Sequence, residues 1–146
     1  MDRQQVSFSF HEQVPSQLRE RKKIKRFLND IFLSESSVEG GTVSIVFCSD
    51  EQLLKINQDF LNHDYYTDII TFELSAKSSP LMEADIYISI DRVRDNALQM
   101  GQPYQRELHR VIFHGVLHLC DFKDKNKQDQ SLMRKKEDEW LSKYFD

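Results

Sequence analysis

The chain of 146 residues has the size of one domain, and its 39% apolar and 30% charged residues, with few Gly and Pro, are typical of a folded protein with regular structure. We therefore expect one compact domain over residues 1–146. The formal net charge of −4 excludes recognition of a nucleic acid through overall positive charge, so any such binding must depend on a local site.

Compartment and assembly are predicted from the apolar segments and the cysteines. No apolar run approaches the length that crosses a bilayer, and residues 1–13 alternate where a signal peptide would be continuously apolar. Cys48 and Cys120 both lie in apolar stretches, which favours reduced, buried thiols over a disulfide. We expect a cytoplasmic protein that has no membrane partner and is a monomer.

Strands are predicted where apolar and polar residues alternate or β-branched residues gather, and helices where apolar residues recur every three to four positions. In chain order these are a strand at 6–10, a helix entered at Pro15 and Ser16 and running to about Leu33, a strand at 42–48, a helix at 51–61 capped by Ser49 or Asp50, a strand at 68–74, a surface loop at 76–84, a strand at 85–90, and helices at 91–100, 104–120 and 129–144. This order predicts an α/β (α+β) fold, with a mixed sheet of about four strands packed against helices.

The helix predicted at residues 104–120 carries two histidines that could bind one metal ion. His114 and His118 are four residues apart, so both imidazoles lie on one face, one turn apart. A catalytic zinc usually takes three protein ligands and leaves one position for water. Asp121 and Asp124 are the nearby candidates for the third ligand.

Helix geometry separates the two carboxylates. Along a straight helix Asp121 would lie roughly 10 Å from His114, at about 1.5 Å per residue, which is too far to share one ion. Asp124 follows His114 by ten residues, the spacing of the zinc-peptidase pattern H-E-x-x-H-x-x-G-x-x-H. We therefore predict one Zn²⁺ bound by His114, His118 and Asp124 at the end of the helix. In that pattern a Gly makes the left-handed turn, and here Asp121, which tolerates this conformation, occupies its position.

Several neighbouring residues carry less chemistry. Gly115 stands where a zinc peptidase has its general-base Glu, so a peptidase is disfavoured. A bare H-x-x-x-H is common by chance, and taken alone the pair fits polar residues at the edge of a core at least as well. His109 and Cys120 point away from the pair and are interpreted as structural. The basic run at residues 19–26 could hold phosphates, although the solvated face of an amphipathic helix is favoured.

Residues 114–124, HGVLHLCDFKD, resemble the signature H-G-x-L-H-L-x-G-Y-D-H of the YbeY family of ribosomal-RNA maturation endoribonucleases. The resemblance continues over most of residues 50–140. It includes Ile56-Asn57, TDIITF at 67–72, ADIYIS at 84–89, Arg106-Glu107 and the pair Met133 and Glu137. Relative to the family pattern, Asp124 replaces the third His, Asp121 and Ala84 each replace a Gly, and Leu61 stands where an Arg is usual.

The resemblance implies a metal-dependent, single-strand-specific endoribonuclease of mixed α/β fold that acts in 16S ribosomal-RNA 3′-end maturation and small-subunit quality control. Its catalytic centre would be His114 and His118, acting through the metal and its water, and its partners ribosomal RNA and the small subunit. In this reading zinc lowers the pKa of the bound water and polarises the phosphodiester. Two alternatives stay open: a non-catalytic zinc-containing ribosome-assembly factor, and another metal-dependent hydrolase with a small-molecule or peptide substrate.

Overall fold

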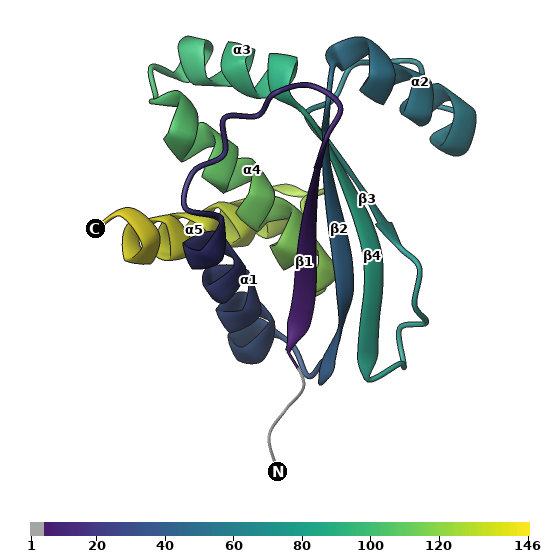
Figure 1. Cartoon of the computed structure of the whole chain (residues 1–146), viewed down its shortest axis with the longest axis vertical. Helices are drawn as coiled ribbons and strands as arrows, with labels where there is room; N and C mark the ends of the chain where they lie inside the picture. The colour runs from purple at the N-terminus through teal and green to yellow at the C-terminus, as the bar shows by residue number, and fades with distance from the viewer. Residues whose placement is uncertain (1–4) are drawn as a thin grey trace.

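The computed structural model describes residues 5–146; residues 1–4, which begin the segment compared above with a signal peptide, lie outside it. Within the described residues the strands form one sheet in the order β1-β2-β4-β3 (Figure 1). Their bounds are β1 Val6–Glu12, β2 Gly40–Cys48, β3 Ile69–Glu73 and β4 Leu81–Ser89. The strands β1, β2 and β4 are parallel, and β3 pairs antiparallel with β4 at the edge. The predicted mixed sheet packed with helices is confirmed.

Alternating burial explains why the central strands form. In β2, Val43, Ile45 and Phe47 are buried while the residues between them are more exposed. In β4, Ile86 and Ile88 are buried on the same face as Ile45. These side chains form the sheet side of the main core, and burying their apolar area is the dominant stabilising term in folding.

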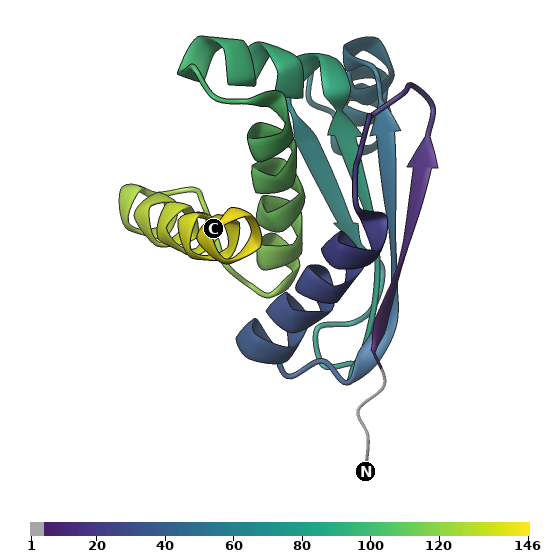
Figure 2. The same cartoon turned by 60° about the vertical axis from the view of Figure 1, so that its left-hand side comes forward.

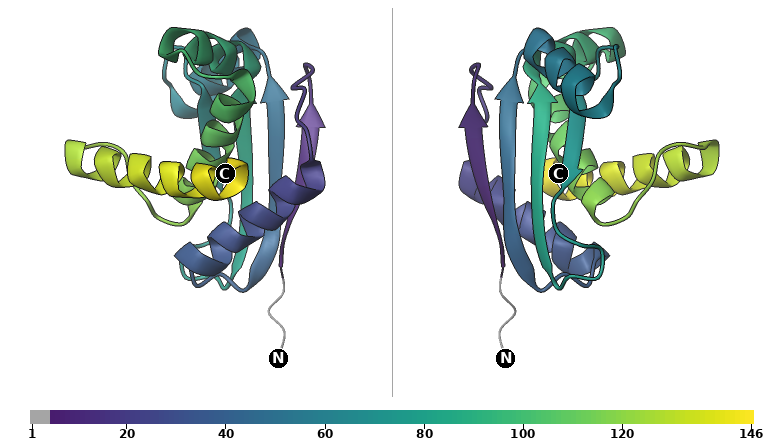
Figure 3. Two further views of the ribbon diagram at one scale, coloured as in Figure 1. Left: turned by 90° about the vertical axis from the view of Figure 1, so that its left-hand side faces the viewer. Right: turned by 90° about the vertical axis from the view of Figure 1, so that its right-hand side faces the viewer.

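The helices cover the two faces of the sheet unequally. In chain order they are α1 Arg21–Glu35, α2 Asp50–Leu61, α3 Ile90–Met100, α4 Tyr104–Leu119 and α5 Lys127–Phe145. Helices α1 and α4 lie against one face, and α5 packs on the outer side of α4 (Figure 2). Helix α2 lies on the opposite side, over one end of the sheet (Figure 3). There Leu53 joins a small second core with Cys48 and Ile70.

Local signals fix most helix ends. Ser49 and Gln52 form a reciprocal capping box at the start of α2. Ser89 caps α3, which ends at Gly101 with φ 62°, a left-handed conformation that Gly adopts without strain. The side chain of Asn126 accepts a hydrogen bond from the backbone N–H of Asp129 and caps α5. Among the described residues, no helix is both long and apolar enough to span a membrane.

The predicted start of the first helix at Pro15 and Ser16 was wrong. Gln17 and Glu20 have φ values of 58° and 52°, so the chain cannot be a right-handed helix there, and α1 begins only at Arg21. The hydroxyl of Ser16 donates to Glu12 and accepts from the N–H of Leu18, which stabilises an irregular segment instead.

The predicted loop at residues 76–84 was also wrong at its end, because β4 starts at Leu81. Long-range pairing extends this strand: Leu81 pairs with Gly40 at the start of β2, and the parallel ladder continues to Ser89. Met82 and Ala84 are buried, whereas Leu81 and Glu83 are exposed, which is the alternation of a half-buried strand. The sequence window of small and polar residues before Leu81 obscured this pattern.

Candidate functional site

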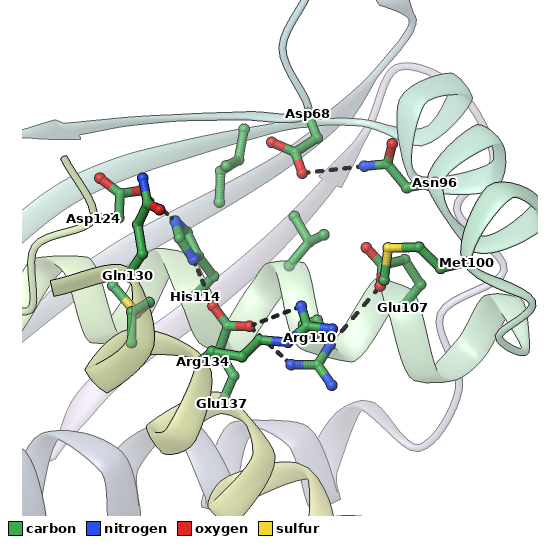
Figure 4. Close-up of a pocket in the computed structure, with 13 residues that line it drawn as sticks. Asp68, Asn96, Met100, Glu107, Arg110, His114, Asp124, Gln130, Arg134 and Glu137 are labelled. Atoms are coloured by element: carbon green, nitrogen blue, oxygen red, sulfur yellow. Dashed lines mark hydrogen bonds and ion pairs between the residues drawn. The ribbon is translucent and has the colours of Figure 1, made fainter. Parts of the chain in front are cut away.

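A cleft of about 380 Å³ opens between α3, α4, α5 and the start of β3 (Figure 4). Helix α4 forms its floor. Also on α4, Gly115 lies so close to the sheet that a Cβ there would be 2.7 Å from Cδ1 of Ile69, and this close approach seats the helix on β3 and β4. The cleft is lined by Asp68, Ile69, Asn96, Met100, Glu107, Arg110, Val111, His114, Asp124, Gln130, Met133, Arg134 and Glu137.

His114 lies between two carboxylates at the outer end of the cleft (Figure 4). Its Nδ1 is 2.7 Å from Oε2 of Glu137, and the ring donates a hydrogen bond to this carboxylate. Its Nε2 is 3.2 Å from Oδ2 of Asp124. The contact with Glu137 therefore fixes the ring orientation and turns Nε2 toward Asp124.

His118 is one turn further along the same helix. Its Nδ1 is 3.0 Å from the backbone carbonyl oxygen of Phe122, to which the ring donates. This contact leaves Nε2 as the nitrogen available to a ligand. The rings of His114 and His118 are parallel within 6°, with centroids 6.3 Å apart. The structure thus brings both predicted histidines to the same helix face, with the same ring nitrogen of each available.

The loop after α4 separates the two candidate carboxylates as helix geometry predicts. Asp121 has φ 72°, which confirms the left-handed conformation expected at this position. Its side chain is 71% exposed and forms an ion pair with Lys77 at 2.8 Å, away from His114. Asp124, three residues later, returns to His114. Of the two, only Asp124 lines the cleft among the described residues.

The donor chemistry fits zinc. Two ligands of a tetrahedral zinc, each at about 2.1 Å, stand roughly 3.4 Å apart, and Nε2 of His114 and Oδ2 of Asp124 are 3.2 Å apart. As the side chains of residues 5–146 stand, however, no three His, Cys, Asp or Glu are grouped closely enough to hold a metal ion together. His114 and Asp124 have the spacing of a pair of ligands, and the three-residue zinc site stays a prediction.

Electrostatics in the cleft favour a cation at His114. Burial, the largest single influence, would lower the pKa of His114, but the surrounding carboxylates together outweigh burial and raise it, with Glu137 contributing most through its hydrogen bond and its charge. The charges of Asp124 and Asp68 act in the same direction. A site that stabilises a proton on this imidazole by surrounding it with carboxylates also stabilises a metal cation bound there.

Two further carboxyl groups face the cleft and have raised pKa values. Burial raises the pKa of Asp68, and the nearby positive charge of His114 opposes this only in part. Burial also raises the pKa of Glu107, with Arg110 opposing. Perturbed carboxyl groups gathered in one concave site are typical of enzymes and can hold or move protons during a reaction.

Sequence reasoning missed the role of α5 in this site. Glu137 accepts hydrogen bonds from His114 and from Arg110, and Arg110 also reaches Asp138. Glu137 was noted only as part of a family pattern, as were Asp68 and Glu107. The available signal was a Glu at helical spacing in line with Met133 and Leu141 on the apolar face of α5. The contact with His114, however, joins residues 23 positions apart and has no local pattern.

Other residues singled out in the sequence lie elsewhere. In the basic run, Arg21 pairs with Glu12, and Lys23 donates to the carbonyl oxygen of Tyr144. These two side chains therefore connect α1 to β1 and α5. Leu61 ends α2, is 39% exposed, and is absent from the cleft lining as described. His109 is buried, and both cysteines are free and buried, as expected of structural residues.

Comparison with known proteins gives the family to which this chain belongs. A mixed α/β fold with a cleft lined by titratable side chains of shifted pKa is typical of enzymes. The family described as "Endoribonuclease YbeY" matches residues 6–145. Proteins of this name from Cytophaga hutchinsonii and Flavobacterium psychrophilum are 48% and 45% identical, over 96% and 91% of this chain and 96% and 93% of their own. The chain therefore belongs to the endoribonuclease YbeY family.

A solved structure supports the fold. The solution structure of TM1509 from Thermotoga maritima superposes with a TM-score of 0.66 and 26% sequence identity, covering 96% of this chain and 89% of that one. The overlap extends over nearly the whole chain, so the arrangement of sheet and helices described above is shared at this level of similarity.

Proposed function

We propose that this chain is an endoribonuclease that cleaves single-stranded ribosomal RNA at a centre containing one zinc ion. His114, His118 and Asp124 bind the ion. Membership of the endoribonuclease family supports the reaction type, and the environment of His114 is the observation that carries the site: its Nε2 faces Asp124 at 3.2 Å while Glu137 holds Nδ1.

Zinc, when bound, supplies Lewis acidity that polarises a phosphodiester oxygen and lowers the pKa of water. The protein contributes positioning. Glu137 holds His114 in the tautomer whose Nε2 is a ligand, and Arg110 in turn holds Glu137 at 2.9 Å. Arg134, which is exposed at the rim of the cleft, is available to a phosphate oxygen.

We further propose that the substrate is the small-subunit ribosomal RNA, whose 3′ end the enzyme matures, and that the same reaction serves quality control of that subunit in the cytoplasm. This part follows from the family resemblance. It predicts that a single-stranded fragment from the 3′ end of 16S RNA is cleaved, whereas the same fragment annealed to its complement resists cleavage.

The test combines metal analysis with RNA cleavage. Protein reconstituted with zinc should retain about one equivalent, and His114→Ala should lose both zinc and cleavage, while His11→Ala, which removes an exposed histidine outside the cleft, should keep both. Asp124→Ala should weaken zinc retention far more than Asp121→Ala, because Asp121 pairs with Lys77.

Three outcomes separate the alternatives. A protein that takes up no zinc after reconstitution contradicts the metal centre. Zinc retention without cleavage of any single-stranded RNA would identify a non-catalytic assembly factor. Equal zinc loss in the Asp121 and Asp124 variants would mean that another residue is the third ligand.

A further inference from the structure

The end of the cleft furthest from Asp124 is formed by Glu107 of α4 and by Asn96 and Met100 of α3 (Figure 4). Glu107 is only 4% exposed. Its Oε1 is buried and accepts no hydrogen bond from any of residues 5–146. The ion pair of this oxygen with Nε of Arg110 is long, at 3.9 Å, and is beyond hydrogen-bond reach. A carboxylate so enclosed lacks the donors that normally accompany it.

The charge of the cleft selects which part of a nucleotide can enter. Its carboxylates are Asp68, Glu107, Asp124 and Glu137. Of its two guanidinium groups, Arg110 is closely paired with Glu137 and Asp138. Arg134 is 53% exposed at the rim and makes a longer ion pair with Glu137, at 3.8 Å. A phosphate is therefore repelled from the interior and favoured at the rim, beside Arg134. The uncharged base is the part of a nucleotide that fits inside.

The size and the walls suit a base. Sites that bury a small ligand usually have a volume of about 300 Å³ or more, and the whole cleft, from Asp124 to Glu107, has a volume of about 380 Å³. Ile69, Val111 and Met133 give it apolar walls between the polar groups. Unstacked bases of single-stranded RNA are commonly held in this way, with the ring against apolar side chains and its edge hydrogen-bonded.

We propose that this inner end is a nucleobase subsite that selects guanine, with Glu107 accepting hydrogen bonds from the N1–H and 2-amino groups; the inference rests on the proposed RNA-cleaving function of the same cleft. Guanine presents two adjacent donors, which match the two oxygens of one carboxylate. Adenine and cytosine present one amino donor beside an acceptor nitrogen, and uracil one donor between two acceptors, so each would direct an acceptor at Glu107.

Binding of free nucleotides tests the subsite without requiring catalysis. Titration of zinc-free protein with GMP, IMP, AMP, CMP and UMP, followed by NMR or calorimetry, should show GMP binding about 10-fold tighter than AMP, CMP and UMP. IMP is the matched probe, because it lacks only the 2-amino group, and should bind with intermediate affinity. Equal affinity for all five nucleotides would overturn the proposal.

Two variants locate the effect. Glu107→Gln keeps the shape but replaces one acceptor with a donor, and should remove the preference for GMP, while Glu83→Gln on the exposed face of β4 should keep it. Met100→Trp leaves the carboxylate intact and should weaken GMP binding by narrowing the same end of the cleft. Unchanged GMP binding in either cleft variant would contradict the assignment.

Cleavage assays then separate this inference from the proposed function. Oligonucleotides carrying one guanine at successive positions should be cut at a fixed distance from it, and replacing that guanine with inosine should reduce cleavage several-fold. Cleavage without any guanine preference would refute the subsite while the nuclease function stands. A GMP preference without cleavage would support the subsite and refute the nuclease function.

Discussion

His109 and His114 lie five residues apart on α4, yet their surroundings are opposite. His109 is 2% exposed, lies against the rings of Tyr144 and Phe145, and donates from Nδ1 to the carbonyl oxygen of Gln105 at 2.6 Å. His114 is partly exposed and lies between the carboxylates of Glu137 and Asp124.

The pKa values follow from these surroundings. Burial lowers the pKa of His109, and its backbone hydrogen bond opposes this only in part. For His114 the carboxylates outweigh burial, and the pKa rises. On the same helix, His109 is therefore a neutral packing residue, and His114 is a group that stabilises a cation. The difference comes from helix α5, which presents the aromatic ring of Tyr144 to His109 and the carboxylate of Glu137 to His114.

The largest expected effect tests whether His109 contributes to the stability of the fold. His109→Ala should lower the free energy of unfolding by about 2–4 kcal/mol, because it leaves a cavity among aromatic rings. His114→Ala in zinc-free protein should cost less than about half of that, since the cleft is open to water. Urea denaturation of both variants measures the difference, and a larger loss for His114→Ala would reverse the two roles.

A smaller effect tests whether Glu137 prepares His114 to bind zinc. Glu137→Gln should weaken zinc affinity about 10–100-fold, because the amide no longer favours the ligand tautomer of His114 with a charge. Asp138→Asn is the matched control: Asp138 also binds Arg110 but makes no contact with His114. Competition with a chelator of known affinity measures both variants, and equal weakening would attribute the effect to Arg110 instead.

The smallest effect is on the pH dependence of stability. Because the pKa of His109 is lowered in the folded state, the unfolded chain binds the proton first as the pH falls below about 6.5. The stability that neutral His109 contributes is therefore complete above that pH and declines below it. His109→Phe, which cannot titrate, should show a shallower loss between pH 7 and pH 5 in thermal melts. The charges of Glu20 and Lys23 also act on the pKa of His109. If the melting temperature of His109→Phe falls with pH as steeply as that of the unaltered protein, groups other than His109 control the pH dependence.

Local patterns predicted the fold class, the order of elements and the helix that carries the site, because alternation, capping and helical periodicity are properties of neighbouring residues. They also predicted the left-handed turn at Asp121. The choice of Asp124 over Asp121 as a zinc ligand stays a prediction, although only Asp124 lies beside His114. The start of α1 was missed, because it depends on the positive φ of Gln17 and Glu20, residues that carry no strong signal for that conformation.

The interior of the site could not be predicted in the same way. Asp68 comes from the approach to β3, Asn96 from α3 and Glu137 from α5, and they line one cleft with His114 only because these elements pack around α4. The family resemblance included Asp68 and Glu137, but it did not indicate which side chains they contact. The orientation of His114 by Glu137 and the enclosed carboxylate of Glu107 are tertiary features.

The two thiols have a practical consequence. Burial raises the pKa of Cys48 to about 11 and that of Cys120 to about 12, and both side chains are enclosed in the folded protein. Thiolate is the species that reacts with maleimides and iodoacetamides, so both native cysteines should stay unmodified in folded protein at neutral pH. A single cysteine introduced at exposed Gln130, on the rim of the cleft, would then accept a fluorophore selectively in an otherwise unaltered chain. Binding of RNA at the cleft could then be followed in real time by the change in fluorescence of this single label.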